Sequence, residues 1–152
     1  SSGYLVTEFS GEVIRLHRDH LGRLTPAEAL SAVDPDAHLA HSRYGADPRA
    51  EHLIWGADVH RAGQHVLATE RTASTIASIA LDNTGRLARV EAIRPTEPQP
   101  RGFAVSSDGT RVVVVGELGS DAVLYAMDDA GQLAELDRVH TGKGANWVRF
   151  VA

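Results

Sequence analysis

The sequence predicts an all-β fold made of β-propeller blades, each a four-stranded antiparallel sheet. Three copies of one pattern carry this prediction: a Glu ends an apolar run, a turn and a second apolar run follow, and a Gly-x-Leu step leads into a third. The copies begin at Glu8, Glu70 and Glu117, and each Gly follows its Glu after 14 or 15 residues. The copies recur after 62 and then 47 residues. Repeats of ~40–50 residues built from short strands are typical of propeller blades, because one blade alone cannot bury its faces.

The second and third copies each predict four strands. We expect strands over residues 54–59, 65–70, 75–81 and 87–93 in the second unit, and over 103–106, 111–118, 122–127 and 134–140 in the third. These runs are rich in β-branched and apolar residues, and Gly, Asn, Asp or Pro bounds them. Ser107-Asp108-Gly109-Thr110 predicts a tight turn. The valines at 112–115 show no polar alternation, which favours a strand covered on both faces.

The first unit and the C-terminal segment complete the predicted architecture. The first unit opens at residues 4–8, which correspond to the second strand of the other units, and residues 147–151 resemble the first strand of a fourth unit. We therefore expect twelve strands offset by one, an arrangement that removes an unpaired edge by closing a ring. The predicted domain is a partial propeller over 1–152. Its parts are blades at 1–33, 54–95 and 101–141 and a closing strand at 147–152.

Residues 32–53 predict an excursion from the propeller body. The first repeat interval is 15 residues longer than the second, and this stretch is crowded with Asp, His, Arg and Pro. We expect a helical turn near residues 48–52. A long loop in a compact domain is usually functional or disordered, so the excursion is either a lid on the channel mouth or a surface loop without a role.

Composition restricts the classes of function. The net charge of −5 argues against a nucleic-acid partner, because such proteins usually cluster Lys and Arg against phosphates. No cysteine is present, so no disulfide or thiolate metal site is predicted. No apolar stretch approaches the ~20 residues of a membrane span. We expect no membrane partner and a cytoplasmic protein. Serine-hydrolase, phosphate-loop and zinc-protease motifs are also missing from the sequence.

Three clusters carry a resemblance to a known family. They are Trp-Gly-Ala-Asp-Val-His at 55–60, Glu-Arg-Thr-Ala-Ser at 70–74, and Pro-Thr-Glu-Pro-Gln-Pro-Arg-Gly-Phe at 95–103. With these clusters in this order, the chain resembles the lactonase family of seven-bladed β-propellers, and it matches the last three blades. The resemblance implies about three blades of a seven-bladed ring.

The resemblance implies a hydrolase acting on lactones. It implies opening of 6-phosphoglucono-1,5-lactone to 6-phosphogluconate in the pentose phosphate pathway, or the muconate-type lactone chemistry of related propellers. No metal or organic cofactor is implied. Two departures bear on ligand access: the turn at residues 61–64 is short, and the excursion at 32–53 is long.

Four residues supply the chemistry that lactone opening requires. The reaction needs a base for water, donors for the oxyanion and a partner for a phosphate, which Arg recognises well. The catalytic candidates are His60, as base or orienting group at the end of an inner strand, and Glu8, which orients His60 or acts as the base. Arg71 and Arg101 are substrate-binding candidates, expected at one mouth of the channel.

Each candidate also has a structural interpretation. Glu70 and Glu117 are further substrate-binding candidates, but the repeat places all three Glu equivalently, so some are expected to be turn residues only. A single His at a strand end often has a purely structural role. For Trp55 and Trp147, we favour core packing over stacking on a ligand.

The alternatives for function and assembly stay open at this stage. A catalytically silent propeller that serves as a binding scaffold is the competing function, since one fold hosts many activities. The remaining blades come from another chain or a missing segment, or two copies close into a six-bladed ring. A lone three-blade monomer would expose two apolar blade faces.

Overall fold

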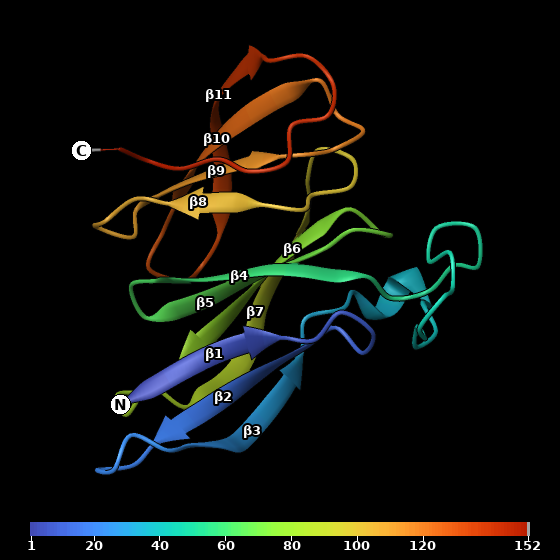
Figure 1. Cartoon of the computed structure of the whole chain (residues 1–152). Helices are drawn as coiled ribbons and strands as arrows, with labels where there is room; N and C mark the ends of the chain where they lie inside the picture. The colour runs from blue at the N-terminus through green and yellow to red at the C-terminus, as the bar shows by residue number, and fades with distance from the viewer. Residues whose placement is uncertain (152) are drawn as a thin grey trace.

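The computed structural model describes residues 1–151 and confirms the all-β prediction. Within these residues it contains eleven strands in three antiparallel sheets and one short 3₁₀ helix, η1 (Pro35–Ala37). The sheets follow one another in chain order, as successive blades do (Figure 1). No helix in this part of the chain is long and apolar enough to cross a membrane.

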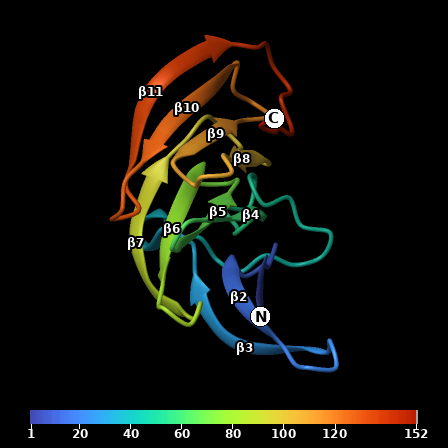
Figure 2. The same ribbon diagram turned by 90° about the vertical axis from the view of Figure 1, so that its left-hand side faces the viewer.

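Each sheet is a meander in which consecutive strands pair. The first sheet contains β1 (Ser2–Val6), β2 (Glu12–Arg18) and β3 (Leu24–Ser31); the second contains β4 (Gly56–Ala62), β5 (His65–Glu70), β6 (Thr75–Leu81) and β7 (Leu87–Pro95); the third contains β8 (Phe103–Val105), β9 (Arg111–Val115), β10 (Asp121–Met127) and β11 (Leu133–His140). The first strand of each four-stranded sheet lies on the inner side, where β1, β4 and β8 are neighbours, and the last strand lies on the outer side (Figure 2).

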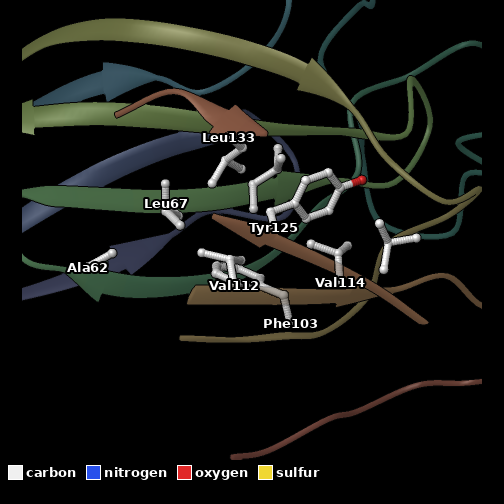
Figure 3. Packing of buried hydrophobic residues seen from close by; sticks show 9 residues of the cluster. Ala62, Leu67, Phe103, Val112, Val114, Tyr125 and Leu133 are labelled. Carbon is white, nitrogen blue, oxygen red and sulfur yellow. The ribbon is translucent and has the colours of Figure 1, made fainter. Parts of the chain in front are cut away.

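The core lies between the sheets rather than within any one of them. Leu67 of β5 contributes to a cluster shared with the third sheet, while Val66 and Ala68 contribute to a cluster shared with the first. Figure 3 shows Leu67 facing Val112 and Tyr125 across the first of these clusters. Every residue of β5 is buried. Continuous apolar strands follow from this arrangement, because a blade with two neighbours has no solvent face.

The predicted tight turn in the third blade is present. Asp108 accepts hydrogen bonds from the Ser106 hydroxyl at 2.6 Å and from the Thr110 N–H at 3.0 Å. The Ser106 hydrogen bond is the main reason that the pKa of Asp108 is lowered to about 2. Gly109 has φ of 75°, which glycine adopts without steric cost.

The two ends of the chain give different outcomes. The first sheet has three strands, one fewer than each of the other two, as expected for a unit that opens one strand late. Residues 147–151 form no strand in the described chain; the closing strand expected over 147–152, whose last residue lies outside the described residues, stays a prediction. A strand is defined by a hydrogen-bonded partner, and within residues 1–151 this segment has none. It crosses the start of the third sheet instead, where Asn146 and Trp147 pack against Gly102.

The excursion is confirmed as a segment without regular strands. It contains η1 and a single parallel bridge between Ala40 and Leu53. A helical turn is present near its end, where the Glu51 N–H donates to the Asp47 carbonyl at 3.0 Å. The segment projects from the side of the sheets (Figure 1).

Candidate functional site

A polar cavity of about 310 Å³ lies where β1 ends and β4 begins. Its walls carry two arginines, two carboxylates and one tryptophan among small or apolar residues. The lining residues are Val6, Glu8, Gly56, Ala57, Asp58, Arg71, Arg101 and Trp147. A larger cavity of about 590 Å³ lies between the excursion and the outer part of the first two sheets, but no arginine lines it. The smaller cavity therefore matches the predicted chemistry of an anionic substrate.

The turn after β1 reaches this cavity because a glycine faces it. The Gly56 N–H donates to the Glu8 carbonyl at 2.8 Å. A Cβ atom at residue 56 would lie 2.3 Å from the Thr7 carbonyl oxygen, so any other residue would push the turn away. Gly56 thus brings Glu8 of the first sheet to the start of β4.

Arg71 is held in what we call the Arg71 assembly, formed by Glu8, Trp55 and Arg71. The arginine follows β5, and its guanidinium lies 3.8 Å from the centre of the Trp55 ring. Its Nη2 donates to Glu8 Oε1 at 3.0 Å and to the Gly56 carbonyl at 3.1 Å. The side chain is only 8% exposed. Burial lowers the pKa of Arg71 and the Glu8 carboxylate opposes this effect, so the group stays cationic.

Glu8 has one engaged oxygen and one free oxygen. Its Oε1 accepts from the Trp55 indole N–H at 2.8 Å as well as from Arg71. Its Oε2 has no hydrogen-bond partner within residues 1–151, and the side chain is 54% exposed. No hydrogen bond joins Glu8 to His60 within residues 1–151; His60 Nε2 pairs with Asp58 instead, which corrects the expectation that Glu8 orients this histidine. The free oxygen leaves Glu8 able to accept a proton from a water molecule in the cavity.

Arg101 belongs to a looser group, the Arg101 assembly of Arg101, Glu117 and Trp147. Its Nη1 lies 3.4 Å from Glu117 Oε1, and its guanidinium is 5.7 Å from the centre of the Trp147 ring. The Arg101 side chain is 45% exposed. Glu117 does not line the cavity; it also accepts from Gln99 Nε2 at 2.6 Å. It therefore positions Arg101 rather than facing a ligand.

Asp58 is a cavity residue that the sequence analysis missed. Its Oδ2 accepts from His60 Nε2 at 3.0 Å and from the Phe103 N–H at 3.2 Å, and its Oδ1 accepts from the Val59 N–H at 2.9 Å. Burial favours the neutral acid, but these hydrogen bonds, led by that from His60, outweigh it and lower the pKa of Asp58. The sequence contained a signal for this pairing: Asp58 and His60 are two residues apart on one strand, so their side chains lie on the same face.

His60 lies inside β4 rather than at its end, which corrects its predicted position. Its ring packs edge-on against Phe103 with centroids 4.7 Å apart, and it does not line the cavity. Because His60 hydrogen-bonds to Asp58, which lines the cavity, His60 helps to fix the position of the Asp58 side chain.

Glu70 is a structural residue, which corrects its assignment as a substrate contact. It is 2% exposed, and its carboxylate accepts from the backbone N–H groups of Trp55, Thr72 and Ala73 at 2.7, 3.0 and 2.6 Å. These bonds tie the turn after β5 to the start of the second sheet. They place Arg71, whose N–H donates to the Trp55 carbonyl at 2.9 Å.

The described residues 1–151 hold no group of three or more metal-ligating side chains. The cavity's own side chains supply two guanidinium groups that attract anions and a carboxylate oxygen without a hydrogen-bond partner within residues 1–151.

The stacked antiparallel sheets, with a polar cavity where β1 ends and β4 begins, define a set of β-propeller blades. The chain belongs to the family described as "Lactonase, 7-bladed beta-propeller", whose model matches residues 2–150.

Several relatives extend this comparison. A 6-phosphogluconolactonase of Cronobacter sakazakii is 35% identical over 97 residues, which are 62% of this chain and 29% of that protein. The crystal structure of a Lactobacillus plantarum protein matches with a TM-score of 0.81 at 25% identity, covering 99% of this chain and 42% of the other. The periplasmic gluconolactonase of Pseudomonas aeruginosa shares the fold with a TM-score of 0.72 at 23% identity, over 94% of this chain and 38% of that one. The chain thus spans less than half the length of these relatives.

Proposed function

We propose that this chain forms part of a lactone hydrolase that opens 6-phosphoglucono-1,5-lactone. The observation that carries the proposal is the convergence of Glu8, Arg71 and Arg101 on one polar cavity. A phosphorylated lactone carries an anion and a carbonyl, and two guanidinium groups supply donors for both. Membership of the lactonase family and the similarity to a 6-phosphogluconolactonase support this assignment.

In the proposed reaction, Glu8 acts as the general base. Its free Oε2 takes a proton from a water molecule as the water oxygen bonds to the lactone carbonyl carbon. The guanidinium groups stabilise the negative charge that forms on the carbonyl oxygen. The bond between that carbon and the ring oxygen then breaks, and Glu8 returns the proton to the ring oxygen, which leaves as a hydroxyl group. The product is the open-chain carboxylic acid.

Asp58 is less suited to the base role than Glu8. Both of its oxygens already accept hydrogen bonds, and its lowered pKa makes it a weaker proton acceptor. Its contact with the Phe103 N–H links the second sheet to the third. We assign it a positioning role.

The cavity is proposed to be completed by further blades. In the described chain, the outer strand of the third sheet leaves Leu136 and Val139 53% and 59% exposed, although side chains on blades are normally covered by a neighbouring blade. A partner carrying the remaining blades, or a second copy, would cover this face. Intact mass under native conditions separates these options: one copy plus a larger partner supports the first, and two copies support the second.

The proposal is tested by measuring hydrolysis of 6-phosphoglucono-1,5-lactone in the native assembly against the spontaneous rate. Replacing the base by Glu8→Gln is expected to lower kcat about 10²–10⁴-fold while KM changes little. Asp129→Asn, in the exposed turn between β10 and β11, is the control carboxylate-to-amide change and should leave both constants unchanged. A Glu8→Gln variant as active as the native assembly would remove Glu8 from the reaction. A native assembly that leaves the lactone at its spontaneous rate would favour the scaffold alternative.

A further inference from the structure

Trp147 is an exposed aromatic surface at the mouth of a polar cavity. Within residues 1–151 its side chain is 74% exposed, so it does not pack in the core that these residues form, contrary to the expectation. It is the one aromatic residue among those lining the cavity in the described chain. The remaining lining residues are charged, small or aliphatic, so Trp147 provides the only broad π surface that a ligand there could contact.

Trp55 does not line the cavity, and two lining residues, Glu8 and Arg71, already contact its ring. The Arg71 guanidinium covers its ring at 3.8 Å, and its indole N–H donates to Glu8. Trp147 is less constrained: its indole N–H has no hydrogen-bond partner within residues 1–151, and the Arg101 guanidinium lies over its ring at 5.7 Å from the ring centre, farther than Arg71 lies from Trp55. The Trp147 ring is therefore available to a ligand, while the Trp55 ring is not.

The backbone holds Trp147 in place through Gly102. A Cβ atom at residue 102 would lie 2.6 Å from the Asn146 carbonyl oxygen and 2.7 Å from Trp147 Cδ1. Residue 102 must therefore lack a side chain for the C-terminal segment to cross here. Because Gly102 directly follows Arg101, this close approach also sets Trp147 beside the guanidinium.

We propose that Trp147 is a specificity-determining residue that stacks against the ring of a sugar-derived lactone while the arginines hold the anionic group. The inference rests on the function proposed above and adds the substrate class to it. One face of a pyranose or lactone ring presents C–H groups, which pack favourably on the electron-rich face of an indole. An open-chain sugar acid presents no such continuous face. Trp147 thus favours the closed substrate over the open product.

Binding of two matched ligands tests the inference without measuring turnover. Glucose 6-phosphate carries a closed ring, and sorbitol 6-phosphate carries the same phosphate on an open chain. In the native assembly, Trp147→Ala is expected to weaken glucose 6-phosphate binding about 10-fold and sorbitol 6-phosphate binding less than 2-fold, as measured by calorimetry. Trp147→Phe, which keeps a smaller aromatic face, should lose less than 3-fold for either ligand.

Steady-state kinetics test the stacking contact of Trp147 in a second way. Trp147→Ala should raise KM for 6-phosphoglucono-1,5-lactone about 10-fold while kcat changes less than 2-fold, because a stacking contact binds substrate and transition state alike. Gly102→Ala, which displaces Trp147 without removing it, should reproduce the rise in KM. Leu21→Ala, in the exposed turn between β2 and β3, is the control.

The outcomes separate this inference from the proposed function. If Trp147→Ala weakens both phosphates equally, or neither, the stacking role is wrong even when the lactone is hydrolysed. If the ring-selective loss appears but the lactone stays at its spontaneous rate, Trp147 stands as a sugar-binding residue and the hydrolase assignment fails. If the native assembly binds neither sugar phosphate, both the stacking role of Trp147 and the proposed hydrolase function are wrong.

Discussion

The Arg71 assembly and the Arg101 assembly contain the same three residue types, Glu, Arg and Trp, yet they hold their arginines differently. Arg71 is 8% exposed and its guanidinium lies 3.8 Å from its tryptophan, whereas Arg101 is 45% exposed and 5.7 Å from its own. Arg71 has therefore lost its rotamer freedom before a ligand arrives, and Arg101 loses most of its own on binding. The comparison shows that one residue set can form a fixed anchor in one blade and an adjustable arm in the next.

The backbone explains the difference between the two arginines. Arg71 sits in a turn that the buried carboxylate of Glu70 closes through three backbone N–H groups. Arg101 lies in the linker between β7 and β8, after Gln99, whose φ of 59° is unusual for a residue other than glycine. Around Arg101, the contacts come from side chains that remain partly exposed. A fixed backbone with buried partners makes Arg71 the fixed anchor, and a linker with exposed partners makes Arg101 the adjustable arm.

Removing the anchor is expected to have the largest effect. Arg71→Ala leaves Glu8 without its cationic partner and uncovers Trp55, so we expect the free energy of unfolding to fall by about 1–3 kcal/mol. Hydrolysis should fall at least about 10²-fold in kcat/KM, since a donor to the oxyanion is lost. Arg71→Lys should recover little of either, because an ammonium cannot stack and fork as a guanidinium does.

Urea denaturation and lactone hydrolysis measure these two losses. Arg89→Ala on β7 is the control, because this arginine is exposed and forms only a surface ion pair with Glu91. A stable and active Arg71→Ala protein would show that the anchor is not needed.

Removing the arm is expected to affect the substrate more than the fold. Arg101→Ala should change the free energy of unfolding by less than about 0.5 kcal/mol, as is usual for an exposed side chain. It should raise KM for the phosphorylated lactone about 10-fold and leave KM for glucono-1,5-lactone nearly unchanged, since only the former carries the anion. Equal changes for the two lactones would contradict a role of Arg101 in binding phosphate.

Glu70 and Glu117, which occupy equivalent positions in the repeat, provide a further comparison of the two assemblies. Glu70→Gln loses a charged acceptor of three backbone N–H groups, and we expect a loss of about 1–2 kcal/mol in the free energy of unfolding. Glu117→Gln weakens a 3.4 Å contact to an exposed arginine and a hydrogen bond from the Gln99 side chain, both between side chains, and should cost less than Glu70→Gln, about 0.5 kcal/mol. Thermal unfolding of both variants measures the difference. A larger loss for Glu117→Gln would reverse the assignment of anchor and arm.

The fold could be predicted from the sequence because a repeat of strands and turns leaves a periodic trace. Residues buried on both faces, such as those of β5, give continuous apolar runs, and Gly109 marks a hairpin directly. The positions of Arg71 and Arg101 beside strand ends also follow from the pattern. What the repeat does not determine is the direction in which equivalent side chains turn. Glu70 turns inward to its own backbone, whereas Glu8 turns outward to the next blade.

The remaining site residues depend on contacts between segments distant in sequence. In the described chain, residues 147–151 form no strand, and Trp147 is exposed. The position of Trp147 depends on the missing side chain of Gly102, which lies 45 positions earlier in the sequence. Asp58 enters the site because Phe103, on the next sheet, donates to it. Periodicity within one blade contains no information on these contacts between blades.

Asp58 joins the blades that carry the two assemblies, and its titration provides the smallest and most specific test. Its pKa in the folded protein lies below the value of about 3.9 expected for an unfolded chain. The ionised group therefore stabilises the fold above pH ~4, and this contribution is lost as the pH falls through the folded pKa. Asp58→Asn should lower the free energy of unfolding at pH 7. The difference in this free energy between the native protein and the variant, the gap, should narrow as the pH falls from 5 to 2. The other carboxylates titrate in both proteins and cancel in the difference, so urea denaturation along this series isolates Asp58. A gap that stays constant with pH would show that the carboxylate charge does not join the blades.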